Sequence, residues 1–329
     1  MASKKPQLTP ADYLPLLISI SRTVFSTAVS ALTAFWRGAS GAPSYKHHVL
    51  YAAMRAYTKY TTTSRLQATT PSTGELYGAF VKSKSLPHTD VVLADKTSAY
   101  WLGDKAADKL LLFFHGGGYV TAATDAHFQL LFDVVQQAQS RGKSLAVLVL
   151  EYDMAPAARY PTQVRQATYA FKYLMEDMKI PCSKILLAGD SAGGNLALAL
   201  LSHIAHPSAA IAPVVKASQP LLGVFLLSPW VTFSINAPSM TSNVYKDCID
   251  VETVYMWSRD FLGTTSEDNY NVPLNADPTW WSSLKVNDVC ITAGRNEVFL
   301  DDIVAFANKM EVDTLLNVSS ILVPSLNSS

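Results

Sequence analysis

Residues 184–195 read Lys-Ile-Leu-Leu-Ala-Gly-Asp-Ser-Ala-Gly-Gly-Asn, and Ser191 is the centre of a Gly-x-Ser-x-Gly pattern. An apolar run precedes the pattern at Lys184–Ala188, and a helical pattern follows at Ala192–Ile204. A serine on so tight a strand-to-helix turn stands clear of the sheet, because flanking glycines remove side chains that would clash. The start of the helix directs N–H groups and a positive dipole end toward developing negative charge. The stretch therefore predicts Ser191 as a nucleophile at the edge of a sheet.

A second glycine pattern, His115-Gly116-Gly117-Gly118-Tyr119, follows another apolar run at Leu110–Phe114. Three consecutive glycines let the backbone approach a ligand closely and turn N–H groups toward it. An oxyanion hole needs such donors near the oxygen of a tetrahedral intermediate. The two patterns, each at the end of a strand, together predict acyl-transfer chemistry.

The rest of the chain alternates strand-length apolar runs with helical patterns. Several runs have no polar alternation, which is typical of parallel strands covered on both faces. The expected strands are Asp90–Leu93, Ala99–Leu102, Leu110–His115, Leu145–Glu151, Lys184–Ala188, Gly223–Leu227 and Val289–Ala293. The expected helices between them are Ala126–Ser140, Thr162–Met178, Ala192–Ile204, Val251–Phe261 and Asp301–Met310. We expect a three-layer α/β/α sandwich with a mostly parallel, doubly wound sheet and chemistry at the carboxyl ends of its strands.

The amino-acid composition limits the class of molecule that the protein is expected to bind. Of 329 residues, 49% are hydrophobic, and 26 Lys and Arg balance 26 Asp and Glu, so no long-range attraction to nucleic acid is expected. The sequence favours a small apolar substrate, without a cofactor. Cys182, Cys248 and Cys290 have no metal-site spacing, so we expect no metal and reduced thiols in an intracellular, cytoplasmic protein.

The N-terminal segment from Leu14 to Trp36 predicts an amphipathic helix. Hydroxyl residues and Arg22 recur on one side, and Leu, Ile, Val, Ala and Phe recur on the other. Arg22 interrupts the apolar stretch, which argues against a signal peptide. Two interpretations remain: the helix packs on the body of the protein, or residues 14–36 make peripheral contact with a membrane.

The two glycine patterns resemble those of the hormone-sensitive-lipase-like group of α/β-hydrolases. The resemblance covers roughly residues 75–310 and includes Tyr152–Pro156, Tyr160-Pro161 and Leu227–Trp230. Ala157 departs from it, since many members carry Glu there. It implies a helical cap from residues 1–75, a core from 76–310 and a second cap insertion at about 236–275.

The resemblance also implies roles for individual residues. Ser191 would be the nucleophile of an esterase or lipase-like site. Backbone N–H groups of Gly117, Gly118 and Ala192 would form the oxyanion hole, with support from His115, Gly116, Gly189, Asp190 and Gly193. The triad acid should follow Gly294 by two or three residues, where Glu297 stands; Asp301 and Asp302 are the alternatives.

The triad histidine should follow the acid, but the seven histidines all precede Glu297. They are His47, His48, His88, His115, His127, His203 and His206. Residues 311–329 form an atypical tail in place of the family's last strand and histidine loop, so we expect an exposed edge and an impaired hydrolase. One hypothesis is a truncated, alternatively spliced or misread C-terminus.

Two other functions stay open. One is a small-molecule-binding protein on the same fold, as in the plant gibberellin receptors, which resemble this family and lack the working histidine. The other is a lipid-surface protein that acts through its first helix.

Overall fold

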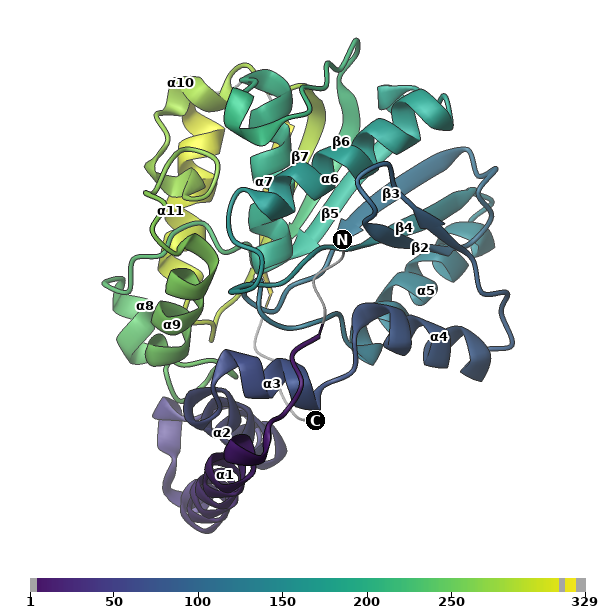
Figure 1. Cartoon of the computed structure of the whole chain (residues 1–329). Helices are drawn as coiled ribbons and strands as arrows, with labels where there is room; N and C mark the ends of the chain where they lie inside the picture. Colours follow the sequence, from purple (N-terminus) through teal and green to yellow (C-terminus); the bar gives the residue numbers. More distant parts are fainter. Residues whose placement is uncertain (1–4, 314–316, 324–329) are drawn as a thin grey trace.

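The computed structural model describes residues 5–313 and 317–323. The molecule is built around a central sheet (Figure 1), which has eight strands. The strand order is β1-β2-β4-β3-β5-β6-β7-β8. Strands β3 to β8 run parallel to one another, whereas β2 is antiparallel to both β1 and β4. The strands are β1 (Asp90–Val92), β2 (Ser98–Leu102), β3 (Lys109–Phe114), β4 (Leu145–Glu151), β5 (Ile185–Asp190), β6 (Leu221–Leu227), β7 (Val286–Gly294) and β8 (Asn317–Val323). The expected α/β fold with a mostly parallel sheet is confirmed.

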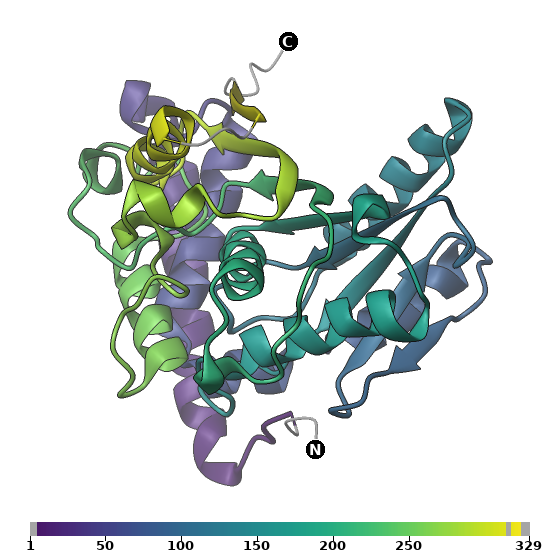
Figure 2. The ribbon, with the colours of Figure 1, turned by 90° about the horizontal axis from the view of Figure 1, so that it is seen from above.

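Helices cover both faces of the sheet because its central strands are apolar on both sides. In β3, Leu110 and Leu112 pack on one face and Leu111 and Phe113 on the other, as a period of two requires. The first face carries α6 (Thr162–Lys172), α7 (Ala192–Ala205) and α11 (Leu300–Asp313). The second carries α4 (Thr73–Ser83) and α5 (Asp125–Ser140) (Figure 2).

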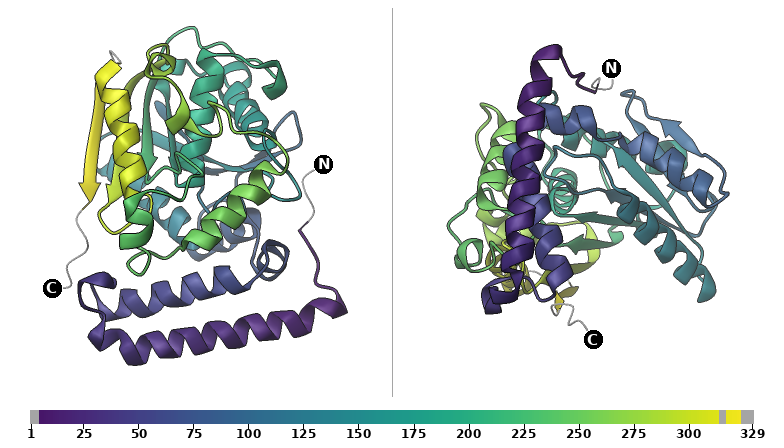
Figure 3. Two further views of the ribbon diagram at one scale, coloured as in Figure 1. Left: turned by 90° about the vertical axis from the view of Figure 1, so that its left-hand side faces the viewer. Right: turned by 90° about the horizontal axis from the view of Figure 1, so that it is seen from below.

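The remaining helices form a cap beyond the carboxyl ends of the strands. Helices α1 (Tyr13–Thr33) and α2 (Tyr45–Tyr60) make an antiparallel pair along one side of the molecule (Figure 3). The other cap elements are α3 (Thr63–Thr69), α8 (Pro238–Ser242) and α9 (Val251–Leu262), while α10 (Pro278–Trp281) packs beside α11.

Two further helices follow α2 before the first strand. Helix α3 lies between α2 and α4, and α4 begins at Thr73 and packs on the sheet. The Ser72 hydroxyl accepts the Glu75 N–H at 3.1 Å, and the Glu75 carboxylate accepts the Ser72 N–H at 2.7 Å. This capping box starts α4 despite the surrounding Thr, Pro and Gly.

The expectation that the tail lacks a last strand is wrong. The tail from Asn317 to Val323 forms β8 parallel to β7, with Val289 opposite Val318. Its Val and Ile content suits an extended strand, and its weak apolar alternation hid the strand from the sequence pattern. Residues 314–316 and 324–329 of the tail lie outside the described residues.

One part of the sheet is open. Among the described residues, no helix covers β6, β7 and β8 on the α5 side, where a hollow of about 470 Å³ is lined by Phe225, Cys290 and Ser319. Phe225 remains 39% exposed there, although it lies in an inner strand.

Candidate active site

A cavity of about 470 Å³ opens at the carboxyl ends of β3, β5, β6 and β7, beneath the cap. Its wall is mostly apolar, with a few polar groups that converge on Ser191. The lining residues are Met54, Thr58, Gly117, Gly118, Thr121, Thr124, His127, Asp190, Ser191, Ser228, Trp230, Asp247, Cys248, Ile249, Val254, Trp257, Glu297 and Phe299. An apolar cavity with few convergent polar groups is typical of a small-molecule site.

Ser191 occupies a strained turn between β5 and α7. Its backbone has φ +50° and ψ −116°, a conformation that few non-glycine residues adopt. The turn is held from two sides, because the Ser191 N–H donates to Leu227 O and its carbonyl accepts the Trp230 N–H, both at 2.9 Å. Gly193 has no room for a side chain, since a Cβ there would lie 1.9 Å from the Phe114 carbonyl oxygen. The structure therefore has the tight turn that the sequence pattern predicts.

The glycine loop after β3 presents backbone N–H groups at the same end of the sheet. Gly117 has φ +101°, which orients its peptide in a way that a residue with a side chain would resist. Within the described part of the chain, the N–H groups of Gly117, Gly118 and Ala192 form no hydrogen bond. Three unpaired donors next to a serine hydroxyl are the arrangement that can stabilise an oxyanion.

Asp190 joins the serine turn to the glycine loop. Its Oδ1 accepts the Gly116 N–H at 2.8 Å and lies 3.1 Å from Nε2 of His127. A Cβ at Gly116 would lie 2.1 Å from Asp190 Oδ2, so the two segments touch. Asp190 therefore fixes the loop relative to Ser191.

His127 lines the cavity, but both of its nitrogens are engaged. The Thr124 N–H donates to Nδ1 at 2.9 Å, so Nδ1 carries no proton. The proton of a neutral imidazole then resides on Nε2, which donates to Asp190. In this state His127 has no free lone pair with which to take a proton from Ser191.

His115 is fully buried behind the glycine loop. Its Nδ1 lies 2.8 Å from Gly116 O, and its ring stacks on Tyr152 with a centroid distance of 4.3 Å. Burial lowers the pKa of His115 to about 4, so the ring is neutral. The Tyr152 hydroxyl also donates to His115 O at 2.7 Å. These contacts hold the glycine loop in place from its buried side.

Glu297 is the one predicted acid that reaches the cavity. Its Oε1 accepts the Ser228 hydroxyl at 2.7 Å. Its Oε2 is buried and has no hydrogen-bond partner among the described residues. Burial raises the pKa of Glu297 to about 7, an effect that the Ser228 hydrogen bond opposes and the nearby Asp247 adds to.

The alternative acids lie elsewhere. Asp301 accepts the Ser239 N–H at 2.7 Å and so ties α8 to the start of α11. Burial and, to a smaller extent, the neighbouring Asp301 raise the pKa of Asp302 to about 6. Neither residue lines the cavity as the structure describes it.

The cap supplies residues that sequence reasoning missed. Asp247 is half-buried, and its Oδ2 accepts the Val298 N–H at 2.8 Å. Burial raises the pKa of Cys248 to about 12, which leaves its thiol protonated and unreactive. Met54 and Thr58 come from α2. None of these residues follows a strand, so the rule that active-site residues follow the carboxyl ends of strands could not have identified them. The same rule could have identified Ser228, which lines the cavity and follows β6.

The other histidines are distant from this chemistry. Nε2 of His203 lies 3.0 Å from Pro213 O, and that of His206 lies 2.9 Å from Trp280 O. His47, His48 and His88 lie in or near the cap helices and β1, and none lines the cavity as described. Over residues 5–313 and 317–323, no group of three His, Cys, Asp or Glu side chains is placed to hold a metal.

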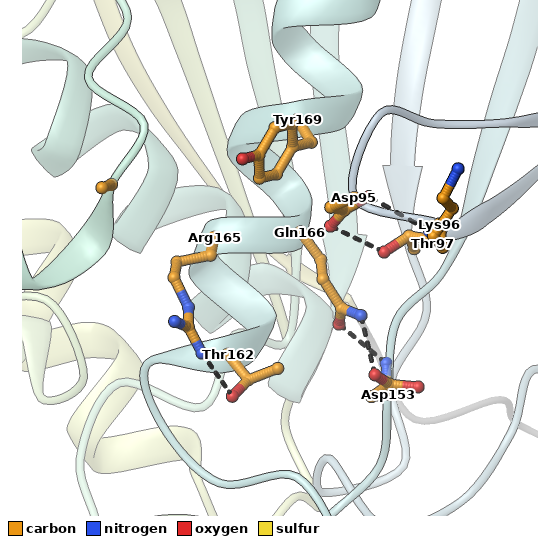
Figure 4. A pocket seen from close by; sticks show the side chains of 9 residues that line it. Asp95, Lys96, Thr97, Asp153, Thr162, Arg165, Gln166 and Tyr169 are labelled. Carbon is orange, nitrogen blue, oxygen red and sulfur yellow. Dashed lines mark hydrogen bonds between the residues drawn. The ribbon is translucent and has the colours of Figure 1, made fainter. Parts of the chain in front are cut away.

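A second hollow, of about 300 Å³, lies beside the start of α6 (Figure 4). Its polar side chains bond mainly to one another: Thr97 donates to Asp95 at 2.8 Å, and Gln166 to Asp153 at 3.0 Å. Arg165 donates to Thr162 at 3.1 Å. With no serine turn and no glycine loop in its wall, this hollow offers no acyl-transfer chemistry.

Comparison with known proteins gives one family. The sequence profile described as alpha/beta hydrolase fold matches residues 111–324. Steryl acetyl hydrolase 1 of Saccharomyces cerevisiae is 27% identical over 222 residues, which are 63% of this chain and 48% of that protein. An acetyl-hydrolase of Streptomyces hygroscopicus is 28% identical over 221 residues, 66% of this chain and 67% of its own. The chain thus spans about half the length of the yeast relative.

Solved structures share the fold. A mutant of the esterase E40 superposes with a TM-score of 0.65 at 23% identity, covering 86% of this chain and 90% of its own. An esterase from the bacterial hormone-sensitive lipase family gives a TM-score of 0.64 at 22% identity, covering 87% and 90%.

Proposed function

Because the chain belongs to the alpha/beta hydrolase fold family, we propose that it is a carboxylic ester hydrolase with Ser191 as its nucleophile. The observation that carries the proposal is the convergence of Ser191, the unpaired N–H groups and Glu297 on one apolar cavity. The family match confirms the expected α/β-hydrolase resemblance.

The proposed reaction is acyl transfer through a serine ester. The Ser191 oxygen attacks the carbonyl carbon, and the N–H groups of Gly117, Gly118 and Ala192 stabilise the oxyanion. The alcohol leaves, and water then releases the acid from the acyl-enzyme. Glu297 is in the place of a triad acid, whose work is to orient a histidine and stabilise its charged form.

No histidine follows Glu297 in the sequence, and His127, which lines the cavity, is committed to Thr124 and Asp190. We therefore propose that turnover by this chain is impaired. A serine hydroxyl without a base is a poor nucleophile. Binding and the oxyanion hole alone still leave roughly 10³–10⁴-fold acceleration over water in serine hydrolases that lose a triad member. A weak, Ser191-dependent activity is the expected result.

The proposed substrate is a small apolar ester. Trp230, Trp257 and Phe299 give the cavity an apolar wall, and the names of two relatives specify acetyl hydrolysis. An acetyl ester of an apolar alcohol is therefore the first substrate class to test. An intracellular location and contact of residues 14–36 with a membrane remain proposals as well.

The test is hydrolysis of a short-chain p-nitrophenyl ester by the full chain, with Ser191→Ala as its matched control. Slow turnover that the substitution abolishes would support the proposal. Equal rates for the two proteins would contradict it.

A second candidate function is small-molecule binding without turnover. It is favoured by Glu297 Oε2, which is buried without a partner, and by His127, whose nitrogens are committed. A binding protein would hold a small apolar ligand at micromolar affinity or better, and Ser191→Ala would leave that affinity unchanged.

A further inference from the structure

Helix α1 turns its polar side inward and its apolar side outward. Ser19 is its one buried residue, and the Ser19 hydroxyl donates to Tyr60 O of α2 at 2.6 Å. The Thr23 and Thr27 hydroxyls bond back to the carbonyls four residues earlier, at 2.9 and 2.7 Å. The hydroxyls of Ser19, Thr23 and Thr27 on this side of α1 are thus bonded within the protein.

The opposite side of α1 is a continuous apolar face. At 100° per residue, these side chains centre on the direction opposite Ser19. Their exposed fractions are Leu14 68%, Leu17 61%, Val24 62%, Phe25 71%, Leu32 72% and Phe35 77%. Next to this face, Trp36 is 81% exposed. A surface helix of a water-soluble globular protein has the opposite orientation, with its apolar stripe packed on the core and its polar side in water.

The charged residues of the same region are all basic. From Tyr13 to Ser72 the sequence has six basic residues and no Asp or Glu. These are Arg22, Arg37, Lys46, Arg55, Lys59 and Arg65. Lys59 pairs with Glu252 and Arg65 with Asp12, and the Arg37 guanidinium donates to three backbone carbonyls. Arg22 and Lys46 have no carboxylate partner in the described chain. Unpaired cations beside an apolar face complement anionic lipid headgroups.

We propose that α1 docks lengthwise on a lipid bilayer through this apolar face. A second copy of the chain would bury the apolar residues but would place the basic residues of two identical segments together. Pro10–Trp36 is long and apolar enough to cross a membrane, with a mean hydropathy of 1.4. However, α1 packs along α2, and α2 carries Lys46, Arg55 and Lys59. Since the pair cannot cross together, α1 lies in the plane of the interface.

The docked orientation places the cavity close to the bilayer. Helix α2 contacts α1 with Tyr60, and its Met54 and Thr58 line the cavity that holds Ser191. Figure 3 shows α1 as the outermost layer, with α2 between it and the sheet. Resting on the proposed hydrolase function, this arrangement makes the substrate a lipophilic ester that partitions into the membrane and reaches the cavity past α2.

Vesicle binding tests the docking without any need for turnover. The full chain carrying Ser191→Ala is incubated with phosphatidylcholine vesicles that contain about one third phosphatidylserine, and bound protein is measured by flotation. Adding Leu17→Ser, Phe25→Ser and Leu32→Ser should lower the partition coefficient more than about tenfold. The matched control, Val92→Ser with Leu130→Ser and Val134→Ser, removes exposed apolar side chains elsewhere and should keep it within about twofold.

Other outcomes would overturn the proposal. Undiminished binding of the α1 variant would do so, as would a dimer that binds no vesicle and dissociates on the same substitutions. Resistance of the bound chain to extraction at high pH would indicate a spanning helix instead.

Turnover separates docking from the hydrolase function. With Ser191 intact, the α1 variant should lose hydrolysis of a vesicle-borne long-chain ester but retain that of a soluble short-chain ester. Equal loss on both esters would contradict delivery from the membrane. If neither ester is hydrolysed by the unsubstituted chain, the hydrolase proposal fails while vesicle binding still decides the docking.

Discussion

The Ser228 hydroxyl donates to Oε1 of Glu297 at 2.7 Å, and this bond leaves Oε2 buried and without a partner among the described residues. A buried carboxylate oxygen without a hydrogen bond costs free energy, so an N–H donor that fits beside it would be bound. Ser191 lines the same cavity. At about 470 Å³, that cavity has room for a small imidazole ring.

We therefore expect added imidazole to accelerate ester hydrolysis by this chain. A neutral imidazole would donate one N–H to Glu297 and take the Ser191 proton with its other nitrogen, which is general-base catalysis worth roughly 10²-fold or more when well placed. The measurement is the initial rate against imidazole concentration. It should saturate, because the base binds at a site.

Two variants distinguish this effect from the ordinary reaction of imidazole with esters in solution. Ser191→Ala should leave only a linear, non-saturating dependence. Glu297→Gln should raise the imidazole concentration needed for half-saturation. A linear dependence shared by all three proteins would contradict the prediction.

His127 should contribute little to turnover. Its Nδ1 accepts the Thr124 N–H and its Nε2 donates to Asp190, so it cannot act as the base for Ser191. His127→Gln is expected to change the Ser191-dependent rate by less than about tenfold, whereas loss of a true base costs about 10³-fold or more. A pH–rate profile of both proteins is the check. Disappearance in the variant of the low-pH limb, over which the rate rises as the base loses its proton, would identify His127 as the base.

The predictable part of the molecule is the part whose geometry the local sequence dictates. The turn at Ser191 and the glycine loop could be predicted because their glycines stand where a Cβ would meet backbone, as at Gly193 and Phe114 O. Glu297 was implied by the family resemblance, which places the acid two or three residues after Gly294. Asp247 could not be predicted, since it reaches the cavity through the packing of a cap segment rather than through a strand end.

Two further elements depended on tertiary context. Strand β8 is stabilised by pairing with β7, which its own short pattern does not reveal. For α1 the sequence defined both faces but not which face turns inward; the hydrogen bond from Ser19 to Tyr60 fixes that.

Gly118→Ala should disturb the cavity through Trp257. A Cβ at Gly118 would lie 2.1 Å from Cε3 of the Trp257 ring, and the residue has φ +62°. The steric clash and the left-handed backbone should together lower the free energy of unfolding by about 2–4 kcal/mol. Adding Trp257→Ala removes the clash, so the double variant should be less destabilised than the sum of the single variants. Additive losses in urea unfolding would show that the indole does not press on Gly118.

Glu297 should make the protein less stable as the pH rises through neutrality. Its pKa is raised to about 7 in the folded chain, above the usual value of about 4.5. The folded state therefore binds the proton more tightly than the unfolded state. This contribution is complete below a pH of about 4.5 and is lost as the pH rises through about 7, on the order of 3 kcal/mol in all.

The matched variant is Glu297→Gln, which keeps the size of the side chain and the amide oxygen for Ser228 but cannot ionise. Its free energy of unfolding, measured in urea between pH 5 and 8, should fall less steeply with pH than that of the unsubstituted chain. The difference between the two curves should grow with pH and level off above about 8, where Glu297 is fully ionised. Parallel curves would mean that Glu297 is already charged at pH 5, and the buried Oε2 would then have to be stabilised by a partner such as bound water.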